Sequence, residues 1–133
     1  MKSSARTGRD HHAAYRFGRR AEALAMLWLW LKGYRVLARG ITSGRGSGAG
    51  EVDMVIRRGR VVAFVEVKAR ATLAAAAEAL GPAQRRRIEA GAAAFLARQP
   101  ALAGCDLRFD VMLLAPGCWP RHLPDAWRPD HAV

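Results

Sequence analysis

The chain has 133 residues, 51% of them hydrophobic and 25% charged, a composition that fits one globular domain and excludes a disordered chain. Lysine and arginine number 22 against 11 aspartates and glutamates, so the net charge is 22 − 11 = +11. This excess favours a polyanionic partner, nucleic acid before an anionic membrane surface, and excludes an acidic solvating tail. The competing explanation is a high-GC genome, which encodes much arginine and alanine.

The two cysteines, Cys105 and Cys118, are too few for a disulfide scaffold and are not spaced like zinc ligands. We therefore expect free thiols in a reducing compartment. The longest apolar run, residues 23–31, is less than half of the roughly 20 residues that cross a bilayer. With no secretory signal in view, a soluble cytoplasmic protein without a membrane partner is predicted.

Residues 1–14 are polar and basic, and we expect a disordered arm before a single domain over 15–133. Residues 15–32 are predicted to be a helix ended by Gly33, because apolar residues recur every three or four positions. The predicted buried stripe contains Ala21, Leu24, Trp28 and Leu31. The second half of this helix is apolar nearly all round, so we expect it to be deeply buried, and the apolar surplus leaves a homodimer open.

Three strands are predicted next, from short apolar runs rich in β-branched residues. They cover residues 34–39, 51–57 and 60–68. The Gly/Ser-rich segment 40–50 is predicted to be a loop, and Arg58-Gly59 is a hairpin-sized link.

The second half of the chain is predicted to hold one helix, from Pro82 to about Arg98, and one strand over 106–115. From about residue 116 the chain is proline-rich, and we expect a loop with at most a short helical turn near 125–127. The order αβββαβ indicates an α/β fold with a mixed β-sheet flanked by helices.

Charged residues stand inside the two hairpin strands. Because side chains alternate along a strand, Glu66 and Lys68 share one face, about 6.6 Å apart. The short turn makes the preceding strand an antiparallel neighbour and brings Asp53 close to Val65–Val67, provided that the face matches. Two buried carboxylates repel each other unless a positive charge lies between them.

A divalent cation would relieve that repulsion. Mg²⁺ accepts one or two carboxylates, a backbone carbonyl and several waters, and a nearby lysine can orient the attacking water or neutralise a developing phosphate charge. The pattern thus suits metal-assisted phosphodiester hydrolysis. From these residues alone, a plain Glu66–Lys68 ion pair with Asp53 capping a turn is an equally good explanation.

Several motifs together resemble the YraN-like family of small bacterial proteins. They are Gly50-Glu51-Val52-Asp53, Phe64-Val65-Glu66-Val67-Lys68-Ala69-Arg70, the helix opening Gly18-Arg19-Arg20-Ala21-Glu22, and Arg108-Phe109-Asp110-Val111. That family is similar to the PD-(D/E)xK nucleases, which implies a restriction-endonuclease-like core akin to Holliday-junction resolvases. The similarity spans about residues 15–115.

The resemblance implies a four-residue site and an Mg²⁺ or Mn²⁺ cofactor. Asp53 and Glu66 would bind the metal with the Val67 carbonyl, and Glu22 would be an outer carboxylate. Lys68 would position the attacking water. Without the resemblance, Glu22 is better explained as a solvated helix residue.

Other polar residues also have predicted roles. Arg70, Arg85 and Arg86 are candidates for phosphate contacts, against an ordinary solvated basic face. Asp110 is expected to pair with an arginine or cap a helix rather than bind metal. Three tail residues are expected to pin the tail to the sheet, with stacking on bases as the alternative: Trp119, His122 and Trp127.

The sequence therefore favours a nuclease that hydrolyses phosphodiester bonds with Mg²⁺, on DNA before RNA and in branched or flapped DNA. The alternative is a non-catalytic nucleic-acid-binding module that keeps the nuclease fold.

Overall fold

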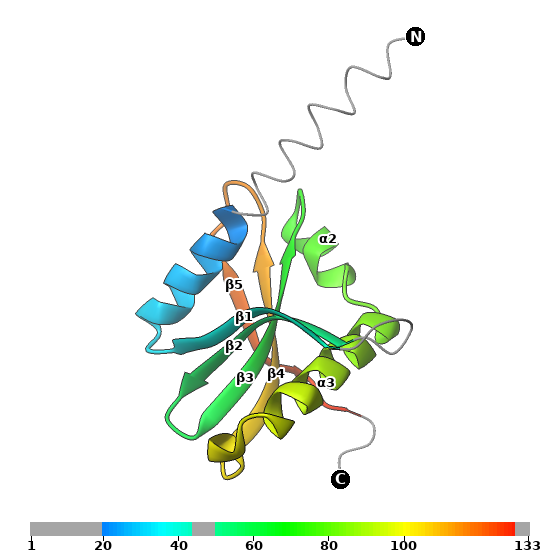
Figure 1. Ribbon diagram of the computed structural model, residues 1–133. Coiled ribbons are helices and arrows are strands. Elements are labelled where there is room, and N and C mark those ends of the chain that lie inside the picture. The colour runs from blue at the N-terminus through cyan, green and yellow to red at the C-terminus, as the bar shows by residue number, and fades with distance from the viewer. Residues whose placement is uncertain (1–19, 44–49, 130–133) are drawn as a thin grey trace.

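The computed structural model describes residues 20–43 and 50–129, and it has the predicted α/β architecture (Figure 1). An N-terminal helix is described over residues 20–31. The elements that follow are β1 (Arg35–Ser43), β2 (Gly50–Arg58), β3 (Val61–Ala69), α2 (Leu73–Glu78), α3 (Pro82–Ala97), the 3-10 turn η1 (Pro100–Leu102), β4 (Asp106–Leu114) and β5 (Arg121–Trp127). The predicted arm, residues 1–14, lies outside the described residues.

The strands form one mixed sheet in the order β1-β2-β3-β4-β5. Only β3 and β4 are parallel; the other neighbouring pairs are antiparallel. A parallel pair needs a crossover connection, and α2 and α3 provide it. In this order β3 is the central strand, and its β-branched residues on both faces suit a strand that is covered on both sides.

The N-terminal helix covers one face of the sheet. Ala21, Ala25 and Leu29, spaced four residues apart, are buried against a cluster that includes Met54 and Val65. Gly33, with φ +92°, ends the helix in the left-handed conformation expected of a terminating glycine. The predicted buried stripe was wrong for Leu24 and Leu31, which are exposed. The deep burial expected for the second half of the helix was also wrong, since Trp30 is exposed as well. In a helix that is apolar nearly all round, periodicity cannot select the buried face, and the small alanines allow the closest approach to the sheet.

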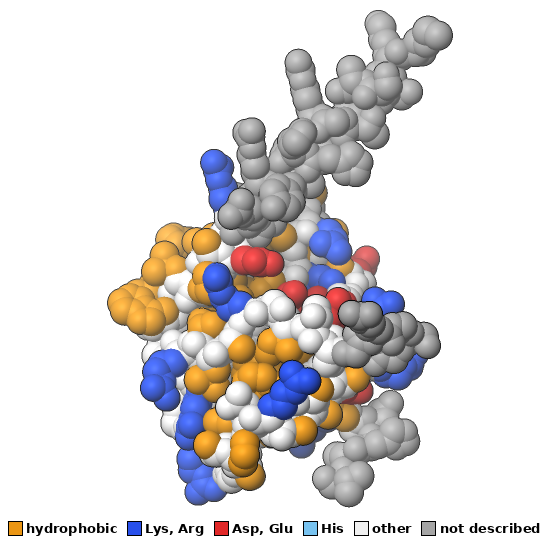
Figure 2. Space-filling model, in the orientation of Figure 1, with side chains coloured by type: hydrophobic (Ala, Val, Ile, Leu, Met, Phe, Trp, Pro, Cys, Tyr) orange, Lys and Arg blue, Asp and Glu red, His pale blue; other side chains and the backbone are white. Residues whose placement is uncertain are grey.

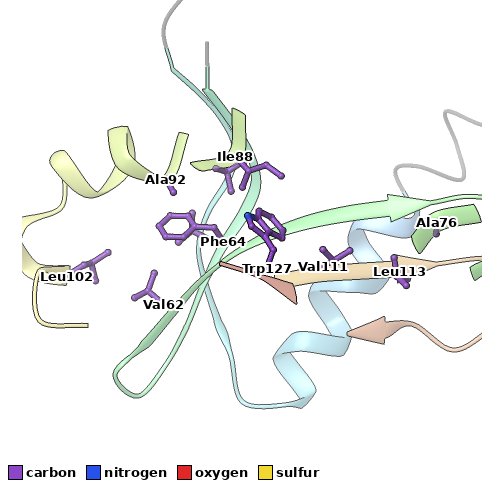
Figure 3. Packing of buried hydrophobic residues seen from close by; sticks show 11 residues of the cluster. Val62, Phe64, Ala76, Ile88, Ala92, Leu102, Val111, Leu113 and Trp127 are labelled. Carbon is purple, nitrogen blue, oxygen red and sulfur yellow. The ribbon is translucent and has the colours of Figure 1, made fainter. Parts of the chain in front are cut away.

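Helix α3 covers the opposite face. Ile88 and Ala92 pack with Phe64 and Val62 of β3 in a second core cluster, which Trp127 also enters (Figure 3). Gly91 lies directly against β2: a Cβ there would be 2.9 Å from Val52 Cγ2 and 3.0 Å from the Glu51 nitrogen. The close approach of α3 to β2 therefore requires glycine at this position.

The structure corrects three local predictions. Residues 40–43 of the predicted loop extend β1, where Ile41 pairs with Val52. The predicted C-terminal loop contains β5, which pairs with β4. Helix α2 was not predicted; its N-terminus is capped by Thr72 Oγ1, which accepts a hydrogen bond from the Ala75 nitrogen at 3.1 Å. Residues 41–43 are stabilised by pairing with β2, and β5 is stabilised by pairing with β4. The prediction was misled because it considered only the local glycine and proline content of these segments.

Candidate functional site

Asp53 lies where the pairing of β2 with β3 stops. The paired register runs from the two-residue turn to Met54 opposite Val65. Beyond it, Asp53 Oδ2 accepts a hydrogen bond from the Val67 nitrogen at 2.8 Å. The carboxylate thus replaces a backbone partner and is fixed beside β3, as the counting from the turn predicted.

Glu66 and Lys68 lie on the α3 side of β3, in the same alternation as Val62 and Phe64, as predicted. Lys68 Nζ is 3.2 Å from Glu66 Oε1. Gln84 Nε2, from the first turn of α3, donates to the same oxygen at 2.7 Å. Both donors hold Oε1, so the second oxygen of Glu66 can face the Asp53 carboxylate.

Burial and the Asp53 charge together perturb Glu66. Glu66 is only 4% exposed. Its pKa is raised from 4.5 to about 7: burial raises it most, the nearby Asp53 charge raises it as well, and Lys68 partly opposes both. The Asp53 and Glu66 carboxylates therefore repel each other, and Lys68 offsets this repulsion only in part.

Glu22 is separated from this pair. It is exposed on the N-terminal helix and lines, together with Asp53 and Arg39, a pocket of about 490 Å³. Within residues 20–43 and 50–129, no three Asp, Glu, His or Cys side chains are close enough to hold a metal ion. The structure thus brings Asp53, Glu66 and Lys68 together and leaves Glu22 across the pocket.

The donor set still suits a hard cation. Asp53 and Glu66 offer carboxylate oxygens, the ligand type that Mg²⁺ prefers, and Mg²⁺ often keeps several waters and takes only one or two carboxylates. In Figure 2, acidic side chains gather between the N-terminal helix and α2, with basic side chains beside them. A divalent cation would also relieve the repulsion that raises the pKa of Glu66.

The predicted phosphate-binding arginines lie near this site and are exposed. Arg70 directly follows β3, and its nitrogen donates to the Leu114 oxygen at 3.0 Å. Arg85 and Arg86 follow Gln84 in the first turns of α3. Glu51, a secondary acidic residue of the motif, lies 4.0 Å from Arg87, outside the Asp53–Glu66 pair.

Asp110 belongs to a separate, structural cluster, as predicted. It is fully buried, with both oxygens bound by Arg108 at 2.8 Å and with His122 Nε2 2.7 Å from Oδ2. Asp125, which has a strained φ of +52°, also donates its backbone N–H to Asp110 Oδ1 at 3.0 Å. His122 and Trp127 thus pin β5 to the sheet. Trp119 is exposed instead, and its ring lies tilted against that of Trp28 on the N-terminal helix, with ring centroids 5.8 Å apart.

Gln84 is the site residue that sequence reasoning missed. Its only local signal was its position, the third residue of a helix that begins at Pro82. A glutamine there is ordinary helix surface. Only the packing of α3 against β3 shows that its amide reaches Glu66.

The comparisons with known proteins agree with the resemblance seen in the sequence. The model of a family described as "Uncharacterised protein family UPF0102" matches residues 21–114. The chain belongs to this family. Its members include the YraN-like proteins that the motifs resemble. A UPF0102 protein of Paramagnetospirillum magneticum is 65% identical over 96% of this chain and 99% of its own length. A relative in Parvibaculum lavamentivorans is 61% identical over 88% of this chain and 85% of its own length. A relative in Methylorubrum extorquens is 50% identical over 96% of this chain and 96% of its own length.

Two further expectations concern the whole chain. Cys105 and Cys118 are both free thiols, as predicted. Across the described parts of the chain, no helix is long and apolar enough to pass through a bilayer.

Proposed function

We propose that this UPF0102 protein is a metal-dependent phosphodiester hydrolase that acts on DNA, in preference to RNA, at branched or flapped structures. The observation that carries the proposal is the meeting of Asp53, Glu66 and Lys68 at the point where β2 and β3 separate. Two close carboxylates beside an ammonium group suit a hard cation and a phosphate together.

Each residue has a distinct role in this proposal. Asp53 and Glu66 would bind Mg²⁺ or Mn²⁺ together with the Val67 carbonyl, and Glu22 would contribute through a water across the pocket. The ion would supply Lewis-acid activation of the phosphate and of a bound water. Lys68 would orient the attacking water and stabilise the charge that develops on the phosphate. Gln84 would hold the Glu66 carboxylate in place.

The positive surface supports a nucleic-acid substrate. Arg70, Arg85 and Arg86 flank the acidic pair, and the whole chain carries +11. Arginines contact phosphates without reading sequence, so this surface would give affinity that falls with salt.

A non-catalytic nucleic-acid-binding module is the second candidate. It is favoured by the finding that no group of three metal-ligating side chains occurs in the described ranges. Calorimetric titration with Mn²⁺ separates the two functions. Binding that Asp53→Asn abolishes supports the hydrolase. No Mn²⁺ binding, together with equal nucleic-acid affinity for wild type and Lys68→Ala, supports the module.

The decisive experiment is cleavage of a panel of branched, flapped and linear DNAs with Mg²⁺ or Mn²⁺. We expect cleavage that Lys68→Ala and Asp53→Asn both abolish. Asp106→Asn, at an exposed residue beside Val61 at the other end of β3, is the matched control and should cleave normally. Cleavage that survives in both site variants would assign the activity to another site or a contaminant.

We further propose that the protein acts in the cytoplasm, as its two free thiols suggest, and that it forms a homodimer through the N-terminal helix. Trp30 and Leu31 are 65% and 66% exposed, and residues 24–31 carry no charge. Figure 2 shows hydrophobic side chains along this edge. Because this segment is uncharged, two copies, each with a net charge of +11, would meet there without placing like charges against each other. Light scattering should show a dimer that Leu27→Glu converts to a monomer; a monomeric wild type would refute the homodimer.

A further inference from the structure

A groove on the α3 side of the sheet has no role in the metal chemistry proposed above, although Arg85 and Arg86, proposed to contact phosphates, lie in its lining. Helix α3 packs mainly on β2, and α2 packs on β3 and β4, so part of the sheet between α3 and β5 is left open. The groove there has a volume of about 760 Å³. Residues of its lining include Phe64, Arg85, Arg86, Leu107, Phe109 and Arg128.

The groove adjoins the candidate site. Phe64 lies on the same face of β3 as Glu66, two residues or about 6.6 Å earlier along the strand. Arg85 and Arg86 directly follow Gln84, whose amide binds Glu66. A polymer held at Glu66 could therefore continue over the first turn of α3 into the groove.

The floor and the rim differ in chemistry. The floor is apolar: Leu107 is half exposed, and Phe109 stacks on Trp127 with ring centroids 5.1 Å apart. The rim is cationic, because Arg85 and Arg86 are exposed and the Arg85 guanidinium lies 5.8 Å from the Trp127 ring centroid. Single-strand-binding proteins combine cations that contact the backbone with aromatic side chains that contact the bases. In this groove the arginines supply the cations, and Phe109 supplies an aromatic ring beside the apolar Leu107.

We infer that this groove binds an unpaired nucleic-acid strand that extends from the duplex held at the proposed site. In a duplex the base faces are stacked inside the helix, so a duplex offers arginines its phosphates but offers the Leu107–Phe109 floor nothing. An unpaired strand satisfies both. The inference rests on the proposed function, since it takes the same substrate one step beyond the Glu66 site.

The test compares a blunt DNA duplex with the same duplex carrying a single-stranded extension of about ten thymidines, a length within the range that single-strand-binding folds cover. We expect wild-type protein, in Ca²⁺ to prevent turnover, to bind the extended DNA about tenfold more tightly. Arg85→Ala/Arg86→Ala and Leu107→Glu should each remove this preference. The matched control, Arg35→Ala/Arg98→Ala, changes two exposed arginines outside the groove and should keep it.

Two results would overturn the inference: equal affinity of the wild type for both DNAs, or a preference that survives Leu107→Glu in a variant with an unchanged circular dichroism spectrum. A groove that holds a protein segment instead would give the first result. Failure of the proposed hydrolysis can be distinguished from failure of this inference. If the protein does not hydrolyse DNA, metal-dependent cleavage will be absent, while the preference for the extended DNA will persist.

Discussion

The Asp53 carboxylate accepts the backbone hydrogen bond of Val67 across the gap where β2 and β3 separate, at 2.8 Å. This contact fixes one acidic group beside the strand that carries the other. Asp53 is therefore a structural and a candidate metal-binding residue at once, whereas Glu22 has only the second role.

That difference predicts unequal effects on metal binding. Asp53→Asn should weaken Mn²⁺ binding by at least about tenfold, since a bound carboxylate contributes both charge and geometry. Glu22→Gln, at an exposed position across the pocket, should weaken it by less than about threefold. Calorimetric titration measures both. Equal losses would mean that Glu22 closes onto the pair when metal binds.

The raised pKa of Glu66 predicts how stability depends on pH. Its folded value of about 7 lies above the ordinary value of 4.5, so its contribution to stability is complete below pH 4.5 and is lost as pH rises through 7. Urea denaturation at pH 5 and pH 8, without metal, should show a larger loss for wild type than for Glu66→Gln. Parallel losses in both proteins would contradict the pKa shift. Added Mn²⁺ should restore the wild-type midpoint at pH 8.

The Asp110 cluster predicts the opposite pH dependence, a loss of stability as the pH falls. Burial would raise the pKa of Asp110, but hydrogen bonds from His122, Arg108 and the Asp125 amide outweigh it and hold the pKa below 3.8. This stabilisation is present above pH 3.8 and is lost as pH falls through the lower folded value.

Removing this carboxylate should be costly, because Arg108 would lose its partner inside the protein. We expect Asp110→Ala to lower the free energy of unfolding by about 3–5 kcal/mol. Arg128→Ala is the matched control: its pair with Asp125 is on the surface, where solvent screens the charges, and its loss should leave stability nearly unchanged. Urea denaturation compares the two, and similar losses would refute the structural role of Asp110.

Gly91 predicts a packing defect near the site. A Cβ at this position would lie 2.9 Å from Val52 Cγ2, so Gly91→Ala should force α3 away from β2 and lower the unfolding free energy by about 1–3 kcal/mol. Ala90→Gly, at an exposed position of the same helix, is a useful comparison, because it should lose only about 1 kcal/mol of helix propensity. A Gly91→Ala protein as stable as wild type would show that the contact relaxes freely.

The sequence by itself determined the hairpin, the face shared by Glu66 and Lys68, and the proximity of Asp53 to β3. These features follow from local alternation and a two-residue turn, so residues close along the chain suffice to predict them. It also predicted the helix that begins at Pro82 and the pairing of Asp110 with an arginine.

Only the tertiary structure decided the rest, because long-range contacts override local preference. β5 forms in a proline-rich segment since Asp110 and β4 bind it from another part of the chain. Gln84 reaches Glu66 only after α3 has crossed the sheet, and the buried face of the N-terminal helix was selected by the close fit of Ala21 and Ala25.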